Sequence, residues 1–92
     1  MSLSKNDVVS VVTLAGEIIG KYKSETTKDV TITDPRLLSQ NEQGLILIPS
    51  LCMTGKPELD EITLSKTSVV LMVPTVEEVE KEYRANTSGI VI

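Results

Sequence analysis

Side chains that commonly carry acid–base or nucleophilic chemistry are scarce in this sequence of 92 residues. It contains no histidine and one cysteine, Cys52, which lies in the apolar run LIPSLCM. Without histidine, the chain lacks the usual general base and the Ser–His and Cys–His nucleophile pairs. One thiol cannot complete a zinc site or form a disulfide within the chain. We therefore interpret Cys52 as a small, buried hydrophobic residue.

Carboxylates and Gly-Lys pairs are the remaining candidates for chemistry. Glu77 and Glu80 are spaced to share one face of a helix, and such a face is more often solvated than catalytic. The two Gly-Lys pairs, at positions 20–21 and 55–56, lack the upstream glycine and the following Ser or Thr of a phosphate-binding loop. The sequence thus predicts no catalytic residues, no metal ligands and no cofactor. An enzyme is the least favoured functional class.

Charge and composition exclude further classes. The formal net charge is −4, which disfavours a general electrostatic grip on nucleic acid or on acidic membranes. The only aromatic residues are Tyr22 and Tyr83, too few for a platform on which bases stack. No apolar run reaches membrane-spanning length, and the start, MSLSKND, lacks the apolar core of a signal peptide. We expect a cytoplasmic protein that does not enter membranes, in keeping with its lone thiol.

Most of the chain has the pattern of short β-strands. β-Branched residues and period-2 alternation dominate, with Ala15-Gly16 as a turn between the first two strands. Val30 and Ile32 are expected to point inward, and Gly20 to mark a bend or a close backbone approach. Asp34-Pro35 is expected to end the third strand, because proline cannot donate to a ladder. The predicted strands are Val8 to Leu14, Glu17 to Ser24, Lys28 to Thr33, Gly44 to Met53 and, in two halves around positions 66–68, Glu61 to Val73.

The last part of the chain changes to a helical pattern. Thr75 and Glu78 form a capping box, and apolar positions then follow at helical spacing, so we predict a helix over 75–85. The terminal SGIVI is apolar, and we expect it to dock on the same chain or on a neighbour. The stretch 36–60 is either one bent strand after Pro35 or a hairpin, and Pro49 is expected to force a bulge or bend within Gly44 to Met53.

These elements predict one mainly β domain over 1–92, with a barrel over about 7–73 and a C-terminal helix and tail over about 75–92. A small antiparallel sheet with internal glycine and proline bends curls into a partly open barrel. A chain this short has a small core, and an open barrel leaves unpaired edges. Head-to-tail pairing of those edges would form a ring, so we expect a cyclic homo-oligomer of about five to seven copies.

Two stretches resemble the conserved motifs of Sm-like proteins. The first is Val12 to Thr33, with glycines at the turn and at the strand bend, and the second is Leu64 to Pro74. The whole chain is most similar to Sm-like proteins encoded by tailed phages, cyanophages included, through "ITDPRLL", "GLILIP" and "EYRANTSGIVI". The resemblance implies a strongly bent five-stranded antiparallel sheet and a ring joined through edge strands. The last strand would supply the subunit interface, with Val69, Val70, Leu71 and Met72.

Typical relatives bind uridine- or adenine-rich RNA at the inner rim of the ring, so the resemblance also implies candidate RNA-binding positions. Thr27 lies near the position of a base-stacking residue, and Asp29 replaces an asparagine that bonds the base. Ser65-Lys66 replaces the Arg-Gly pair of the second motif. Lys28 and Lys66 could line the rim of the ring.

Two functional hypotheses follow. The first is a ring that serves as a structural or interaction module, encoded by a phage and acting in the cytoplasm of a bacterial host. The second is an RNA-binding ring of the RNA-chaperone type. The acidic balance and the replaced motif residues favour the first.

Overall fold

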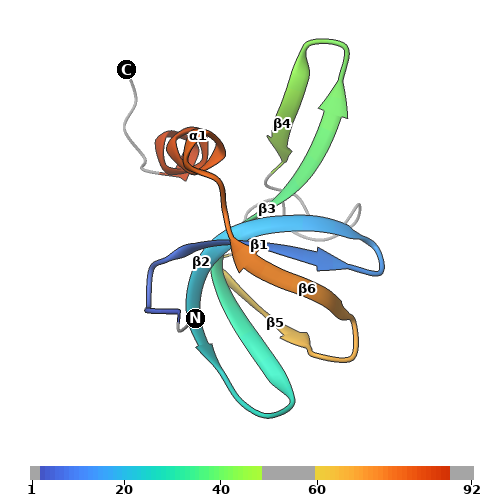
Figure 1. Ribbon diagram of the computed structural model, residues 1–92, viewed down its shortest axis with the longest axis vertical. Coiled ribbons are helices and arrows are strands. Elements are labelled where there is room, and N and C mark those ends of the chain that lie inside the picture. The colour runs from blue at the N-terminus through green and yellow to red at the C-terminus, as the bar shows by residue number, and fades with distance from the viewer. Residues whose placement is uncertain (1–2, 49–59, 88–92) are drawn as a thin grey trace.

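The computed structural model describes residues 3–48 and 60–87 (Figure 1). The predictions for Pro49, Cys52 and the SGIVI terminus lie outside these residues. The elements are β1 (Val8–Thr13), β2 (Gly16–Glu25), β3 (Asp29–Asn41), β4 (Gly44–Ile48), β5 (Glu61–Ser65), β6 (Val69–Pro74) and α1 (Glu77–Thr87). The mainly β class and the single short helix are confirmed.

All strand pairings within the described residues are antiparallel, in the order β4-β3-β2-β1-β6, and β5 also pairs with β3. Six strands are described where five were expected. The long strand β3 pairs with β2 along one edge and carries both β4 and β5 on the other. The sheet bends strongly without closing into a barrel (Figure 1). This arrangement is compatible with the Sm-like fold.

The prediction that the third strand ends at Asp34-Pro35 is wrong, because a β-bulge lets the strand continue. Ile19 pairs with Arg36 and Lys21 with Thr33, so two residues of β3 lie opposite Gly20 alone. A bulged residue needs no ladder hydrogen bond, and proline is tolerated there. Beyond the bulge, the segment from position 36 to position 48 forms a hairpin of β3 and β4, which agrees with the second of the two alternatives.

The close backbone approach expected at Gly20 is present, because a Cβ there would overlap the side chain of Ile32. The sheet is buried on both faces. One cluster, formed by Val9, Val11, Val30 and Ile32, fills the inside of the bend, as predicted for the last two. On the other face, Val8, Ile19 and Tyr83 form a second cluster with partly buried residues of the β3–β4 hairpin and α1. Ile19 is therefore buried even though alternation places it with two lysines.

The helix begins and ends two residues later than predicted. At its start, Thr75 takes another role. Its hydroxyl lies 2.8 Å from that of Ser10, and its amide donates to the carbonyl of Val8 over 3.0 Å. Thr75 thereby ties the start of the helical segment to β1. The predicted capping bond between Thr75 and the Glu78 amide is replaced by this contact with the sheet.

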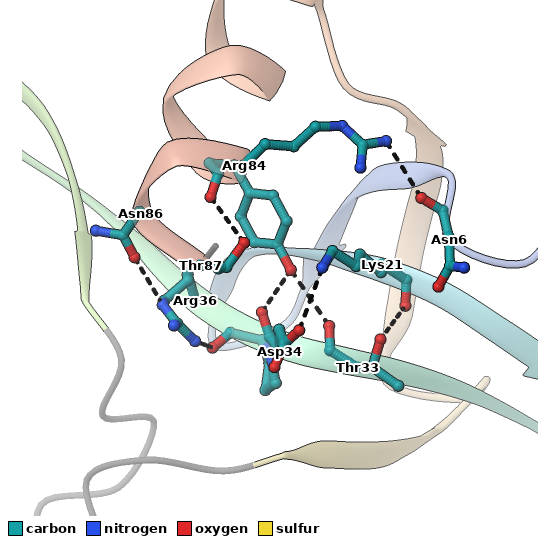
Figure 2. Close-up of polar contacts among 10 residues, drawn as sticks. Asn6, Lys21, Thr33, Asp34, Arg36, Arg84, Asn86 and Thr87 are labelled. Atoms are coloured by element: carbon teal, nitrogen blue, oxygen red, sulfur yellow. Dashed lines mark hydrogen bonds and ion pairs between the residues drawn. The ribbon is translucent and has the colours of Figure 1, made fainter. Parts of the chain in front are cut away.

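Tyr83 anchors the other end of α1 on the bulge. Its hydroxyl donates to the carbonyl of Asp34 over 2.7 Å and lies 3.3 Å from that of Thr33. Around it, Arg36 donates to Asn86 and Arg84 donates to the carbonyl of Asn6 (Figure 2). Burial, with a smaller contribution from the charge of Asp34, raises the pKa of Tyr83 from 10.0 to about 12. The helix is thus fixed to the irregular part of β3 by one buried side chain.

We expect Tyr83→Phe to destabilise the fold by about 1–3 kcal/mol near neutral pH, because two carbonyls lose a buried donor. The raised pKa means that the protonated hydroxyl stabilises the wild type fully below pH 10. This contribution is lost as the pH rises towards about 12. Urea unfolding at several alkaline pH values should show that loss in the wild type and a smaller loss in Tyr83→Phe. Tyr22→Phe serves as the comparison, because the Tyr22 hydroxyl donates to the exposed carboxylate of Glu25 and not to backbone carbonyls. An alkaline loss in Tyr83→Phe as large as that of the wild type would contradict the assignment.

Candidate assembly and nucleic-acid interfaces

In the described part of the chain, the bent sheet has an unpaired strand edge at β6 and, on its opposite side, unpaired edges at β5 and β4. Within residues 3–48 and 60–87, β6 pairs with β1 alone and β5 with β3 alone. The chain crosses from one edge to the other through the turn at 66–68, where the amide of Ser68 donates to the carbonyl of Ser65 (Figure 1). Each edge exposes backbone donors and acceptors that another strand could satisfy. One molecule therefore carries both halves of a head-to-tail strand pairing.

The edge at β6 is also apolar. Val70 is 65% exposed and Leu71 is 50% exposed, and Val73 is exposed as well. Val69 and Met72 are partly buried and pack against the core inside the bend. Of the four predicted interface residues, two are thus accessible to a partner, and Val73 is an accessible residue that the prediction missed.

The edge at β5 has a polar outer side and an apolar inner side. Ile62 and Leu64 pack against the core, whereas Glu61, Thr63 and Ser65 are exposed. Glu61 accepts from Lys23 at 2.9 Å, and the hydroxyls of Thr31 and Thr63 lie 3.0 Å apart. These cross-strand contacts hold β5 on the body while its other edge stays open.

The structure brings the five predicted RNA-binding residues together at one end of the sheet. Asp29 pairs with Ser65 in the ladder of β3 and β5, and the amide of Lys66 donates to the carbonyl of Lys28 over 2.8 Å. Thr27 is exposed in the adjoining turn between β2 and β3. We refer to these five residues as the turn patch. Its formation depends on β5 lying beside β3, far away along the chain.

Lys66 does not contribute a free charge to the turn patch. Its ammonium lies 2.6 Å from the carboxylate of Glu25, which also accepts from the Tyr22 hydroxyl at 3.0 Å. The hydrogen bonds from Lys66 and Tyr22 lower the pKa of Glu25. Desolvation, followed by the bond to Glu25, raises the pKa of Tyr22. Among the described residues, Lys28 is the cation of the patch without an ion pair.

Glu25 was not among the predicted site residues, although it is the last residue of β2 and lies directly before the turn to β3. The sequence shows that Glu25 is acidic and that it lies next to the turn that contains Lys28. The ion pair with Lys66 follows only from the structure, which places the turn at 66–68 beside the turn between β2 and β3. The turn patch is therefore less basic than the two lysines suggest.

An apolar groove of about 450 Å³ runs between α1 and the outer face of the sheet. At one side lie β6 and the start of the helix, and at the other lies the base of the β3–β4 hairpin. Ser10, Thr75 and Glu17 supply its polar atoms. The apolar lining includes Val12, Ile19, Leu38, Leu71, Val73 and Val76.

No family model matches the chain, and no curated protein matches it. In the described part of the chain, no helix is long and apolar enough to cross a membrane. The same residues contain no group of three or more Cys, Asp or Glu side chains placed to hold a metal ion. Function must therefore be argued from the two edges, the turn patch and the groove.

Proposed function

We propose that this protein is a Sm-like ring, a homo-oligomer in which β5 of one copy pairs with β6 of the next. The observation that carries the proposal is the β6 edge, which is unpaired in the described residues and has exposed apolar side chains at Val70, Leu71 and Val73. The open β5 edge is the complementary half. Head-to-tail pairing uses both edges in every copy, and the ring closes when the rotation between copies allows.

The energetics favour pairing over solitary chains. Fully burying a Val or Leu side chain contributes about 1.5–3 kcal/mol, and strand addition at the same time satisfies backbone groups that water otherwise solvates. A domain of this size has a small core and gains much from an interface. Three exposed apolar residues on one short edge strand are therefore a surface on which assembly is favourable.

In this proposal the ring serves as a structural or interaction module. The residues that resemble Sm-like proteins of tailed phages support a phage-encoded protein that acts in the cytoplasm of a bacterial host. Within the described residues, five carboxylates form ion pairs with lysine or arginine side chains. The groove and the hairpin leave each copy with further surface for protein contacts.

Light scattering of the purified protein tests the proposal directly. The expected mass corresponds to about five to seven chains of 10.0 kDa each. A mass of one chain at micromolar concentration would contradict the ring. The ratio of absorbance at 260 and 280 nm, read on the same sample, reports any nucleic acid that copurifies.

RNA binding is a second candidate, favoured by one observation. The hydrogen bond between Lys66 and Lys28 gathers the turn patch at one end of the sheet, and a ring would repeat the patch once per copy. Weak contacts repeated in this way give avidity. Glu25 limits this function because it neutralises Lys66, and Asp29 places an acidic side chain within the patch itself.

We expect Glu25→Gln to bind short oligouridine and oligoadenosine about two- to fivefold more tightly than the wild type at low salt. The variant releases Lys66 from an exposed ion pair of about 0.2–1 kcal/mol. Fluorescence polarisation at two salt concentrations measures the effect, which should shrink at the higher salt. Glu80→Gln, which breaks a helix ion pair with Arg84, is the matched control. If neither the wild type nor Glu25→Gln binds at low salt, the RNA hypothesis fails.

A further inference from the structure

The exposed apolar residues of the groove lie at its β6 side. At the inner side, Leu38 belongs to the base of the β3–β4 hairpin and packs with the core beneath α1. At the outer side lie Leu71 of β6 and Val76 just before α1, which are 50% and 67% exposed. The exposed apolar surface is thus continuous from the β6 edge to the start of the helix. A partner that buries these exposed residues would approach from the β6 side.

Strand order determines what a neighbouring copy would place there. Residues 30–33 of β3 pair with β2 and also with β5, and Leu37 pairs with both Ile18 and Ile48. The strands β4 and β5 consequently occupy the same edge of β3, with β4 beyond the bulge. A copy that presents β5 to a partner therefore presents the free edge of β4 to the same partner.

The direction of pairing places β4 at the groove. All pairings within the described residues are antiparallel, and we take the added pairing to be antiparallel as well. The Glu61 end of the incoming β5 then lies beside the Pro74 end of β6. In the incoming copy, Thr33 pairs with Glu61, and β3 runs from there through the bulge into the hairpin. The hairpin thus extends past the end of β6, where α1 begins.

We propose that the β3–β4 hairpin of the adjacent copy closes the apolar groove between α1 and β6, so that the two copies meet at the groove as well as at the paired edges. This inference rests on the proposed ring. The occupant is a second copy of this chain, and its contact strand is β4, with the sequence GLILI.

The chemistry of the two surfaces is complementary. Strand β4 carries no charged residue, and Ile46 is 39% exposed on the hairpin face opposite Leu47, which packs toward the core beneath α1. The groove offers Leu71, Val73 and Val76 at its β6 side, with the carboxylate of Glu17 as the charged group in its lining. An uncharged apolar strand can enter this groove without bringing a second carboxylate against Glu17.

Cross-linking between two differently tagged versions of the full chain tests the inference. Both carry Cys52→Ser, one also carries Val76→Cys and the other carries Ile46→Cys, and the two are coexpressed so that mixed particles form. A short bismaleimide reagent should give a two-chain product that contains both tags. Val76→Cys alone and Ile46→Cys alone should give none. The matched control replaces Val76→Cys with Leu14→Cys. Leu14 is 80% exposed, and its amide donates to the carbonyl of Ser68, next to the opposite end of β6.

The outcomes are distinct. A doubly tagged product from the Val76→Cys and Ile46→Cys pair, at several times the level of the Leu14→Cys control, supports the hairpin contact. A multi-chain particle without that product overturns the contact and leaves the proposed ring intact. A particle of one chain overturns the inference together with the ring. Strong cross-linking of the Leu14→Cys control instead would mean that the added strand runs parallel to β6, which also overturns the inference.

Discussion

Val70→Lys is expected to reduce the native particle from several chains to one. Val70 is 65% exposed in the single chain, so a lysine there can keep its ammonium in water and leave the fold unchanged. At a paired seam the same ammonium would be desolvated without a partner, at a cost of several kcal/mol per contact. A ring repeats that cost at every interface. Lysine on an edge strand is also a device by which natural sheets prevent edge pairing.

Light scattering and circular dichroism on the same samples measure this effect. The mass should fall to that of one chain while the β-sheet spectrum is retained. Leu14→Lys is the control, because Leu14 is an exposed apolar residue in the turn between β1 and β2 and lies outside strand β6, near the Ser68 turn that precedes it. The interpretation would be wrong if Val70→Lys kept the particle mass of the wild type, or if Leu14→Lys dissociated the particle equally well.

Gly20→Ala should destabilise the folded chain by about 3 kcal/mol, the upper part of the range for an overpacked core. The added Cβ would overlap the Cγ2 methyl of Ile32 and lie 3.1 Å from the carbonyl oxygen of Thr33. Both neighbours belong to β3 just before the bulge, so the strand would have to move away from β2. A chain of 92 residues is typically stable by about 5–14 kcal/mol, so the loss is a large fraction of the total.

Thermal unfolding at fixed protein concentration should show a fall in Tm of about 10–20 °C for Gly20→Ala. The background variant Ile32→Leu identifies the cause, because leucine lacks the Cγ2 methyl and retains the size of the side chain. In that background, Gly20→Ala should cost at least about 1 kcal/mol less. Equal costs in the two backgrounds would show that the Ile32 contact is not the reason for the glycine.

Alternation of apolar and polar residues predicted the side-chain orientation correctly where one face of a strand meets the core and the other meets water. Val30 and Ile32 point inward as predicted, and β5 and β6 separate at the predicted turn. The same rule misplaced Ile19, because α1 returns from the far end of the sequence and buries the second face of β2. A local period describes one strand and does not record which distant element covers it.

Two further features depended on pairing between distant residues. Pro35 was expected to end a strand, and it is accommodated because Gly20 on β2 leaves room for two residues of β3 opposite it. Lys66 was expected to offer its charge to a ligand, but Glu25 binds it once β5 lies beside β3. The residues of the turn patch were found by resemblance, whereas its electrostatics follow from a contact between segments about forty positions apart.

The central claim is that the open edge of β6 is paired with a sister chain, and amide hydrogen exchange at single-residue resolution tests it most directly. We expect the β6 amides that do not bond to β1 to be protected in the wild-type protein and to exchange rapidly in Val70→Lys. Amides of β1 and β2, which are paired within each chain, should stay protected in both and serve as the internal reference. Rapid exchange of those β6 amides in wild-type protein whose β1 and β2 amides remain protected would contradict the claim.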